Sequence, residues 1–183
     1  MALTYSSMLP LGTQLINFDL PNAITGQNYS STEIASHKPI LVMIICNHCP
    51  YVVHYHDELK RLHHDFSEQI SFVAISSNDV NNYPEDSPEK MKELWHELGF
   101  SFPYLYDETQ TVAKAYQAEC TPEFYLFDAK HNLVYRGRCD ATSPKSNEEP
   151  NGEDLRAAIN AIINEQPVNS KQFPSMGCNI KWK

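Results

Sequence analysis

The chain has 183 residues, about the size of one ordinary domain that buries a full core, and 42% of them are hydrophobic. Its formal net charge is −9, so we expect neither nucleic acid nor an anionic membrane as a partner, because both bind basic surfaces. No apolar run reaches the roughly 20 residues of a membrane span, the start lacks a secretory signal, and five cysteines are unlike the dense, even sets of small secreted scaffolds, so the expected location is cytoplasmic.

Short runs of branched apolar residues alternate with segments of helical period, which is the pattern of an α/β domain. Residues 39–45, "PILVMII", are apolar without a break and predict a strand that is buried on both faces. Residues 70–77, "ISFVAISS", predict a second buried strand. Between them one apolar stripe predicts a helix of about four turns. Its members are Val52, Tyr55, Leu59, Leu62 and Phe66.

The middle of the chain carries further helix and hairpin signals. Ser87 before a proline predicts the start of a helix, and Gly99 predicts its end. Asp107 with Gln110 resembles a capping box that opens the next helix. Residues 123–138 predict two strands around a tight turn, which is a hairpin.

The ends of the chain are expected to flank a single domain that covers residues 1–183. Residues 1–36 predict a strand pair laid against the sheet, which would be an N-terminal hairpin extension. A last helix carries apolar residues at helical spacing and ends before Pro167. Residues 167–183 then form a C-terminal tail.

A pair of cysteines lies where the first buried strand gives way to a helix, in "IICNHCPYVVHY", residues 44–55. A cysteine at the N-terminus of a helix faces unpaired N–H groups and the positive end of the dipole, which favour the thiolate. The thiolate of Cys46 is expected to be stabilised more than that of Cys49, because Cys49 lies inside the first turn. His48 is expected to lower the pKa of Cys46 further. The pair therefore supplies redox chemistry with no cofactor and no resident metal.

Several segments resemble one known family: "CNHCPYV", "FPYLYDETQTVAKAY", "CTPEFYLFD" and "PSMGCNIKWK". The chain resembles the redoxin branch of the thioredoxin superfamily, the group named for alkyl hydroperoxide reductase and thiol-specific antioxidant, in its C-x-x-C form. The resemblance implies a thioredoxin-like α/β fold with a central mixed sheet flanked by helices, and an antioxidant role. It also implies a cis proline facing the dithiol, and Thr121–Pro122 stands at the matching place.

The chain departs from its relatives at several positions. Thioredoxins carry a tryptophan before the dithiol, where this chain has Ile45, and a buried carboxylate on the preceding strand, which residues 39–45 lack. Peroxidases of the family use a threonine and an arginine, and the resemblance places Cys46 and Pro122 at those two positions. Reduction of peroxide by Cys49 is therefore expected to be slow, because the oriented donors are lost.

The predicted activity is that of a thiol-disulfide oxidoreductase. Cys46 attacks a disulfide, and Cys49 then attacks Cys46 and releases the reduced partner. The predicted site is Cys46, His48, Cys49, Thr121 and Pro122. The expected substrates are protein or low-molecular-weight disulfides and, in a lesser role, peroxides, with a reducing partner such as thioredoxin or glutathione.

Three alternatives stay open from the sequence. One is a weak peroxidase that uses Cys49 as its reactive thiol. Another is a protein that binds Cu(I) or zinc through the dithiol with Cys120 or a histidine. The third is a catalytically inert interaction module.

Three further residues are predicted as auxiliary to the site. Glu123 is expected either to accept a proton at the dithiol or to be a surface charge, and Cys120 is expected to project near the dithiol. Cys178 is either a resolving thiol carried by a mobile tail or a cysteine buried under a packed tail. Cys139 is expected to be structural.

Overall fold

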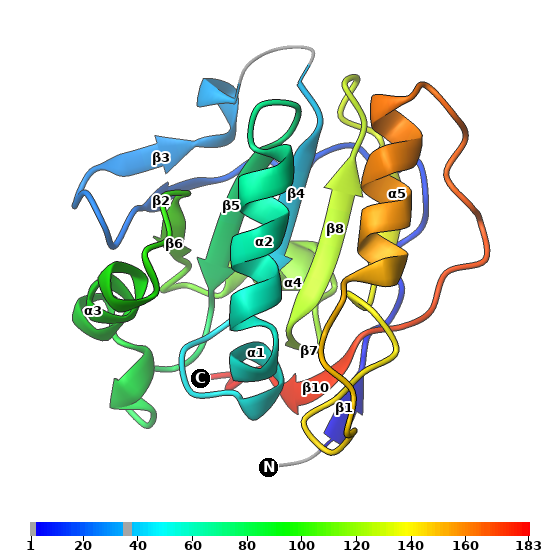
Figure 1. Cartoon of the computed structure of the whole chain (residues 1–183). Coiled ribbons are helices and arrows are strands. Elements are labelled where there is room, and N and C mark those ends of the chain that lie inside the picture. Colours follow the sequence, from blue (N-terminus) through cyan, green and yellow to red (C-terminus); the bar gives the residue numbers. More distant parts are fainter. Residues whose placement is uncertain (1–2, 35–37) are drawn as a thin grey trace.

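A computed structural model describes residues 3–34 and 38–183, and its centre is a five-stranded mixed sheet in the order β6-β5-β4-β8-β9 (Figure 1). Strand β4 pairs parallel with β5 and antiparallel with β8. The mixed sheet flanked by helices is as the sequence predicted. The strands are β4 (Ile40–Ile44), β5 (Ser71–Ser76), β6 (Tyr104–Tyr106), β8 (Glu123–Phe127) and β9 (Leu133–Gly137).

Helices cover both faces of this sheet. Every residue of β4 is buried, because its side chains alternate between two separate cores. Leu41 and Met43 face the core under α2 and α5, which lie in front of the sheet in Figure 1, and Val42 faces the core that includes α4. The helices are α1 (Pro50–His54), α2 (His56–Phe66), α3 (Pro88–Leu98), α4 (Thr111–Ala115) and α5 (Glu153–Ile163).

The predicted four-turn helix is interrupted. Helix α1 ends at His54 and α2 begins at His56, and Tyr55 between them leaves helical geometry at φ −95° and ψ 0°. Its ring is buried, and its hydroxyl donates to Asp140 at 3.0 Å. A tertiary hydrogen bond thus holds the residue at the break, while the apolar stripe remains in the core as predicted.

Both ends of the chain meet in a second sheet, in the order β1-β10-β7. Leu3 pairs with Cys178, and Cys178 pairs with Thr121 on its other side. The N-terminal segment also contributes the predicted strand pair, β2 with β3. No helix in the described part of the chain is long and apolar enough to cross a membrane. The remaining elements are β1 (Leu3–Tyr5), β2 (Asp19–Pro21), β3 (Asn28–Ser30), η1 (Ser31–Glu33), η2 (Pro84–Asp86), β7 (Cys120–Thr121) and β10 (Met176–Asn179).

Candidate active site

The dithiol lies at the edge of the central sheet where β4 ends. Cys46 follows the strand, and Cys49 is the N-cap residue of α1, with Pro50 in the first helical position. This proline is favourable there because the first N–H of a helix has no partner to lose. The side chains of Cys46 and Cys49 are 2% and 0% exposed, so both thiols are buried.

Thr121 contacts both thiols from the neighbouring strand β7. The Thr121–Pro122 peptide bond is cis, as the sequence predicted. The Thr121 hydroxyl lies 3.4 Å from the Cys46 sulfur, and the Thr121 carbonyl oxygen lies 3.2 Å from the Cys49 sulfur. Thr121 and Pro122 are therefore at the dithiol, where the sequence placed them.

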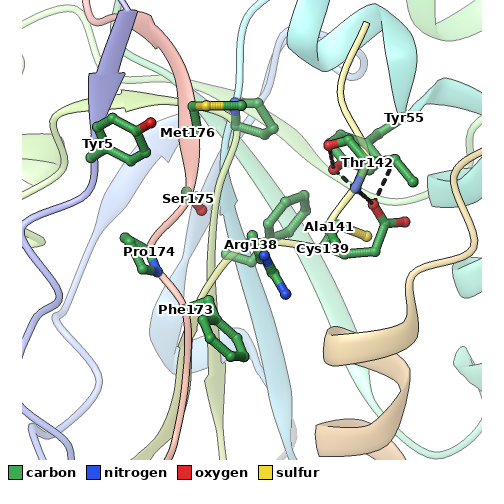
Figure 2. Close-up of a pocket in the computed structure, with 13 residues that line it drawn as sticks. Tyr5, Tyr55, Arg138, Cys139, Ala141, Thr142, Phe173, Pro174, Ser175 and Met176 are labelled. Carbon is green, nitrogen blue, oxygen red and sulfur yellow. Dashed lines mark hydrogen bonds between the residues drawn. The ribbon is translucent and has the colours of Figure 1, made fainter. Parts of the chain in front are cut away.

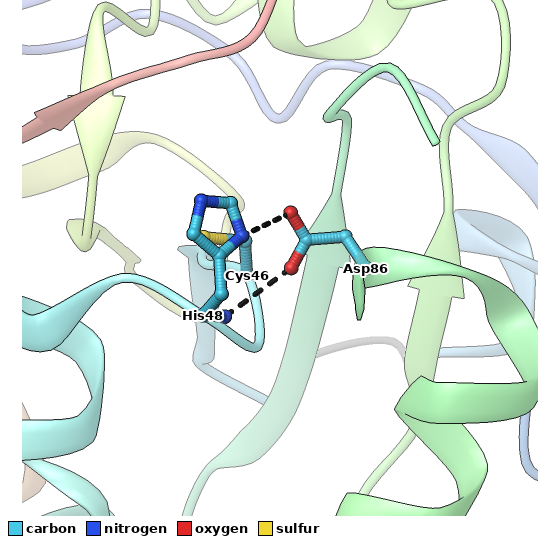
Figure 3. Close-up of side chains that lie close together, drawn as sticks. All are labelled: Cys46, His48 and Asp86. Atoms are coloured by element: carbon cyan, nitrogen blue, oxygen red, sulfur yellow. Dashed lines mark hydrogen bonds and ion pairs between the residues drawn. The ribbon is translucent and has the colours of Figure 1, made fainter. Parts of the chain in front are cut away.

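The loop between the two cysteines is held by one buried carboxylate, Asp86 of η2 (Figure 3). Oδ1 of Asp86 accepts from the backbone N–H of Asn47 at 2.8 Å and of His48 at 3.3 Å. Its Oδ2 lies 2.7 Å from Nδ1 of His48 and accepts from the side-chain amide of Asn78 at 2.7 Å. Four hydrogen-bond partners compensate for the burial of this charge.

Sequence reasoning missed Asp86, although a signal for it was present. Strands β4 and β5 are parallel, so the loops that follow them emerge at the same edge of the sheet. The loop after β4 carries Cys46 and His48, and the loop after β5 carries Asp86 within "NDVNNYPED". Topology therefore brings the carboxylate to the dithiol across 38 residues of sequence.

The pKa values of His48 and Asp86 move in the directions expected of an ion pair. The hydrogen bond to Asp86 raises the pKa of His48 above its ordinary value, although burial opposes the rise. Burial alone would raise the pKa of Asp86, but hydrogen bonds from His48 and Asn78 outweigh it and hold the pKa below its usual range. The His48 ring also stacks on Tyr83, with ring centroids 5.6 Å apart.

Cys49 is the more acidic of the two thiols, whereas the sequence predicted Cys46. The pKa of Cys46 is raised well above its ordinary value, first because its thiol donates to the Cys49 sulfur, and then by burial and by the Asp86 charge. The hydrogen bond from Cys46 lowers the pKa of Cys49 to about 5, and donors from Cys178 and Thr121 outweigh the effect of burial. The Thr121 carbonyl favours the protonated form of Cys49, but it is one acceptor against several donors.

Cys178 lies beside this pair, on strand β10. Of the two placements that the sequence left open, the structure shows a packed tail with a buried cysteine that is 5% exposed. Cys178 pairs with Thr121, whose carbonyl oxygen contacts the Cys49 sulfur, and Cys178 is among the groups that lower the pKa of Cys49. The tail cysteine therefore belongs to the thiol cluster, which we define as Cys46, Cys49 and Cys178.

The other predicted auxiliary residues form a separate group. Glu123 is buried rather than a surface charge, and its Oε1 accepts from the backbone N–H of Cys120 at 3.1 Å and from the Cys120 thiol at 3.4 Å. Its Oε2 accepts from the hydroxyl of Tyr125. Burial raises the pKa of both Glu123 and Cys120. Glu123 is thus engaged with Cys120 and Tyr125, and no hydrogen bond joins it to the dithiol within the described residues.

A cavity of about 260 Å³ adjoins Pro122 (Figure 2). Much of its lining is apolar, from Tyr5, Phe124, Phe173 and Met176, and its polar lining includes the guanidinium of Arg138. The buried thiol of Cys139 lies in its wall, as Figure 2 shows. Residues of β1 and of the C-terminal segment therefore line the cavity together with Pro122.

Cys46, His48 and Asp86 are also the described residues that could hold a metal ion. Their ligand atoms lie within 4.8 Å of one another, and sulfur, imidazole nitrogen and carboxylate oxygen are all zinc ligands. However, both oxygens of Asp86 already accept two hydrogen bonds each, and one of these partners is the His48 ring itself. An ion would have to displace those bonds, so the arrangement fits a positioned imidazole better than a metal centre.

Comparisons with known proteins agree with this fold. The sequence matches the Redoxin family over residues 10–155. An uncharacterized conserved protein from Geobacillus kaustophilus is 50% identical, with a TM-score of 0.97, and the match covers 100% of this chain and 97% of that one. A hypothetical protein from Sinorhizobium meliloti 1021 is 40% identical, with a TM-score of 0.95 and 98% of each chain covered.

A more distant structure shows the fold alone. The thioredoxin domain of a thiol-disulfide oxidoreductase from Bacteroides vulgatus is 16% identical, with a TM-score of 0.60, and the match covers 70% of this chain and 88% of that one. No curated protein matches the sequence. The thioredoxin-like fold that the sequence predicted is thereby confirmed.

Proposed function

Since the chain belongs to the Redoxin family, we propose that it is a redox enzyme, a thiol-disulfide oxidoreductase that works through Cys46 and Cys49. One observation carries the proposal: Thr121, next to the cis proline, contacts both thiols, with its hydroxyl 3.4 Å from the Cys46 sulfur and its carbonyl oxygen 3.2 Å from the Cys49 sulfur. Two thiols that contact the same residue and are only three positions apart in the chain need little movement to form a disulfide. The structural likeness to a protein named as a thiol-disulfide oxidoreductase supports the same chemistry.

We further propose that Cys49, and not Cys46, attacks the substrate. The pKa of Cys49 is lowered and that of Cys46 is raised, which favours Cys49 as the thiol that ionises first. It attacks one sulfur of a substrate disulfide in line, the substrate S–S bond breaks, and one half leaves as a thiolate. Cys46 then gives up its proton and attacks the Cys49 sulfur, which releases the other half. The substrate gains two electrons, and the enzyme keeps a Cys46–Cys49 disulfide.

The surroundings of the dithiol favour a protein disulfide as the substrate. The cavity beside Pro122 is large enough for an apolar side chain of an extended polypeptide, and its lining is suited to one. A reducing partner such as thioredoxin or glutathione would return the enzyme to its dithiol form. We place the reaction in the cytoplasm, where cysteines such as the five free ones of this chain stay reduced.

The lowered pKa of Cys49 also favours a second, weaker activity, the reduction of peroxides. Hydrogen bonds from Cys46, Cys178 and Thr121 stabilise its thiolate, and all three are neutral groups. An efficient peroxidase directs stronger donors at the peroxide oxygens, so we expect this activity to be slow.

A pair of variants tests the proposed function and the order of attack. If Cys49 attacks, Cys46→Ser/Cys178→Ser removes both thiols of the cluster that could resolve the mixed disulfide and should accumulate covalent complexes with substrate proteins, while Cys49→Ser should accumulate few. Both variants should lose most turnover in a disulfide-reduction assay with insulin. Cys120→Ser is the matched control, because that thiol is buried outside the cluster, donates to Glu123 and should be dispensable for turnover.

Two outcomes separate the parts of the proposal. Trapping by Cys49→Ser alone would restore the order of attack predicted from the sequence and leave the activity intact. Full turnover in both variants would refute the disulfide-exchange function.

A further inference from the structure

We propose that Cys178 is a third redox-active thiol, which can replace Cys46 as the partner of Cys49 in a disulfide bond. The inference rests on the proposed function and extends it from two cysteines to three. The oxidised enzyme would then hold either of two disulfides, Cys46–Cys49 or Cys49–Cys178, with Cys49 common to both.

The strand pairing brings Cys178 to the dithiol. Cys178 of β10 stands opposite Thr121 of β7 in an antiparallel pair, and such paired Cα atoms are about 4.5–5.5 Å apart. The carbonyl oxygen of that same Thr121 lies 3.2 Å from the Cys49 sulfur. A Cβ at Gly177 would collide with the Thr121 carbonyl, so a glycine there lets β10 approach β7 closely. Helix α1, which begins directly after Cys49, packs against β10.

Cys46, Cys49 and Cys178 belong to one buried cluster, and Cys46 and Cys178 are both among the groups that lower the pKa of Cys49. Two thiols packed in one cluster with the same sulfur are both within a short movement of bonding to it. Neither remaining cysteine lowers the pKa of Cys49, because Cys120 donates to Glu123 and Cys139 lies in the wall of the cavity beside Pro122.

Oxidation of Cys49 would itself activate Cys178. Burial raises the pKa of Cys178 to about 12, and the hydrogen bond to Cys49 and the charge of its thiolate contribute to the rise. When Cys49 is in a disulfide, it has no negative charge, and the contribution of that charge disappears. The pKa of Cys178 should therefore fall when Cys49 is oxidised, which favours its attack, while burial continues to raise that pKa.

The exchange step balances without any added oxidant. The Cys178 thiol loses its proton, and its sulfur attacks the Cys49 sulfur of the Cys46–Cys49 disulfide. The Cys46–Cys49 bond breaks, the Cys49–Cys178 bond forms, and Cys46 leaves as a thiolate that takes up the proton. No electrons are gained or lost overall. The result is an oxidised enzyme that presents a free Cys46 thiol.

Disulfide mapping tests the inference. The reduced protein is oxidised with glutathione disulfide, free thiols are alkylated, and tryptic peptides are analysed by mass spectrometry without reduction. Lys60, Lys171 and Lys181 place Cys178 in a different peptide from the dithiol, so a Cys49–Cys178 bond joins two peptides. We expect this joined pair in the wild type next to the Cys46–Cys49 form, and as the main product of Cys46→Ser. Glutathione bound at Cys49 of Cys46→Ser, with Cys178 alkylated, would overturn the inference.

Two controls keep the outcomes distinct. Cys46→Ser/Cys178→Ser should yield no joined peptides, while Cys46→Ser/Cys120→Ser should yield them in the amount seen with Cys46→Ser alone. Wild type that forms only Cys46–Cys49 would refute the role of Cys178 and leave the proposed function standing. Wild type that forms no disulfide at Cys49 at all would refute both. The wild-type result does not depend on whether any variant folds. Circular dichroism checks that each variant is folded.

Discussion

At the scale of single residues, Asp86 holds the loop between the two cysteines. The carboxylate fixes two backbone N–H groups between the cysteines and the ring of His48 at the same time. The proton of the His48 ring is held at Nδ1 by this bond, so Nε2 is the nitrogen that changes its protonation. Asp86 also contributes to the raised pKa of Cys46 by its charge, and thereby helps to keep the thiolate on Cys49.

The His48–Asp86 pair predicts a pH-dependent contribution to stability. The pKa of His48 is raised in the folded state, so the stabilisation is complete below the unfolded value of about 6.5 and is lost as pH rises through the folded pKa. The pKa of Asp86 is lowered, so its contribution is present above about 3.9 and is lost as pH falls through the folded pKa. We therefore expect His48→Gln to cost more unfolding free energy at about pH 5.5 than at about pH 8.5.

Urea unfolding of wild type and His48→Gln at both pH values measures this difference. Glu85→Gln is a suitable control, because Glu85 is half-exposed and its carboxylate is 4.0 Å from the His48 ring. Its effect should be small at either pH. An equal cost of His48→Gln at both pH values would show that the pair is not an ion pair in the folded state.

At the scale of secondary-structure elements, the approach of β10 to β7 is the contact that assembles the thiol cluster. Gly177→Ala should destabilise the protein by roughly 1–3 kcal/mol, because the new Cβ meets the Thr121 carbonyl and forces the strands apart. The same displacement should reduce the yield of the Cys49–Cys178 disulfide. Thermal unfolding and the peptide mapping described above measure the two effects.

Gly26→Ala provides the comparison for this variant. A Cβ at Gly26 has no neighbour within 4 Å, and its cost comes from a left-handed backbone, about 1–2 kcal/mol. It should lower stability without changing the disulfide yield. A normal yield of Cys49–Cys178 in Gly177→Ala would show that the close approach of the strands is not needed for exchange.

Local sequence signals predicted most elements but failed where a distant group determined the geometry. The helix from Ser87 to Gly99 follows its caps, since Gly99 adopts a left-handed conformation at φ 69°. Of the capping box predicted at Asp107 and Gln110, only the aspartate contributes. Asp107 accepts from the backbone N–H of Ala113 in the first turn of α4 at 2.9 Å, but the Gln110 side chain donates to the carbonyl of Lys181 at 2.9 Å instead of reaching back to Asp107. A partner 71 residues away therefore replaced the second half of the local motif.

The same limit applied to the candidate site. The dithiol, His48 and the cis Thr121–Pro122 bond were predictable, because each lies within a short motif of the chain. The acidity of the thiols was not predictable, because it depends on Asp86 and Cys178, which reach the site through sheet topology and strand pairing.

At the scale of the whole molecule, the first and last strands close the site together. Leu3 of β1 pairs with Cys178, so β10 has neighbours on both sides. Deletion of residues 1–7 should leave the central sheet folded and expose one edge of β10. We expect alkylation of Cys178 by iodoacetamide to become several-fold faster, because local opening of an unpaired strand edge needs less free energy.

Cys120 serves as the internal reference in this measurement. It is fully buried on β7, whose pairing with β10 the deletion keeps, and its thiol donates to Glu123, so its alkylation should remain slow. Mass spectrometry of each cysteine-containing peptide over time gives both rates. Unchanged labelling of Cys178 would mean that β1 does not protect it.

The second sheet also determines where the protein can be modified for laboratory use. Strand β1 and the C-terminal end of the chain lie at the α1 end of the molecule in Figure 1, and β1 pairs with the strand that carries Cys178. An affinity tag or a fluorescent fusion at either terminus would therefore crowd the approach of a partner. The turn between β8 and β9 is at the opposite end, because the register pairs Ile44 with Glu123 and Ile40 with Phe127. An epitope inserted beside the exposed Lys130 would leave the reactive end open for pull-down experiments.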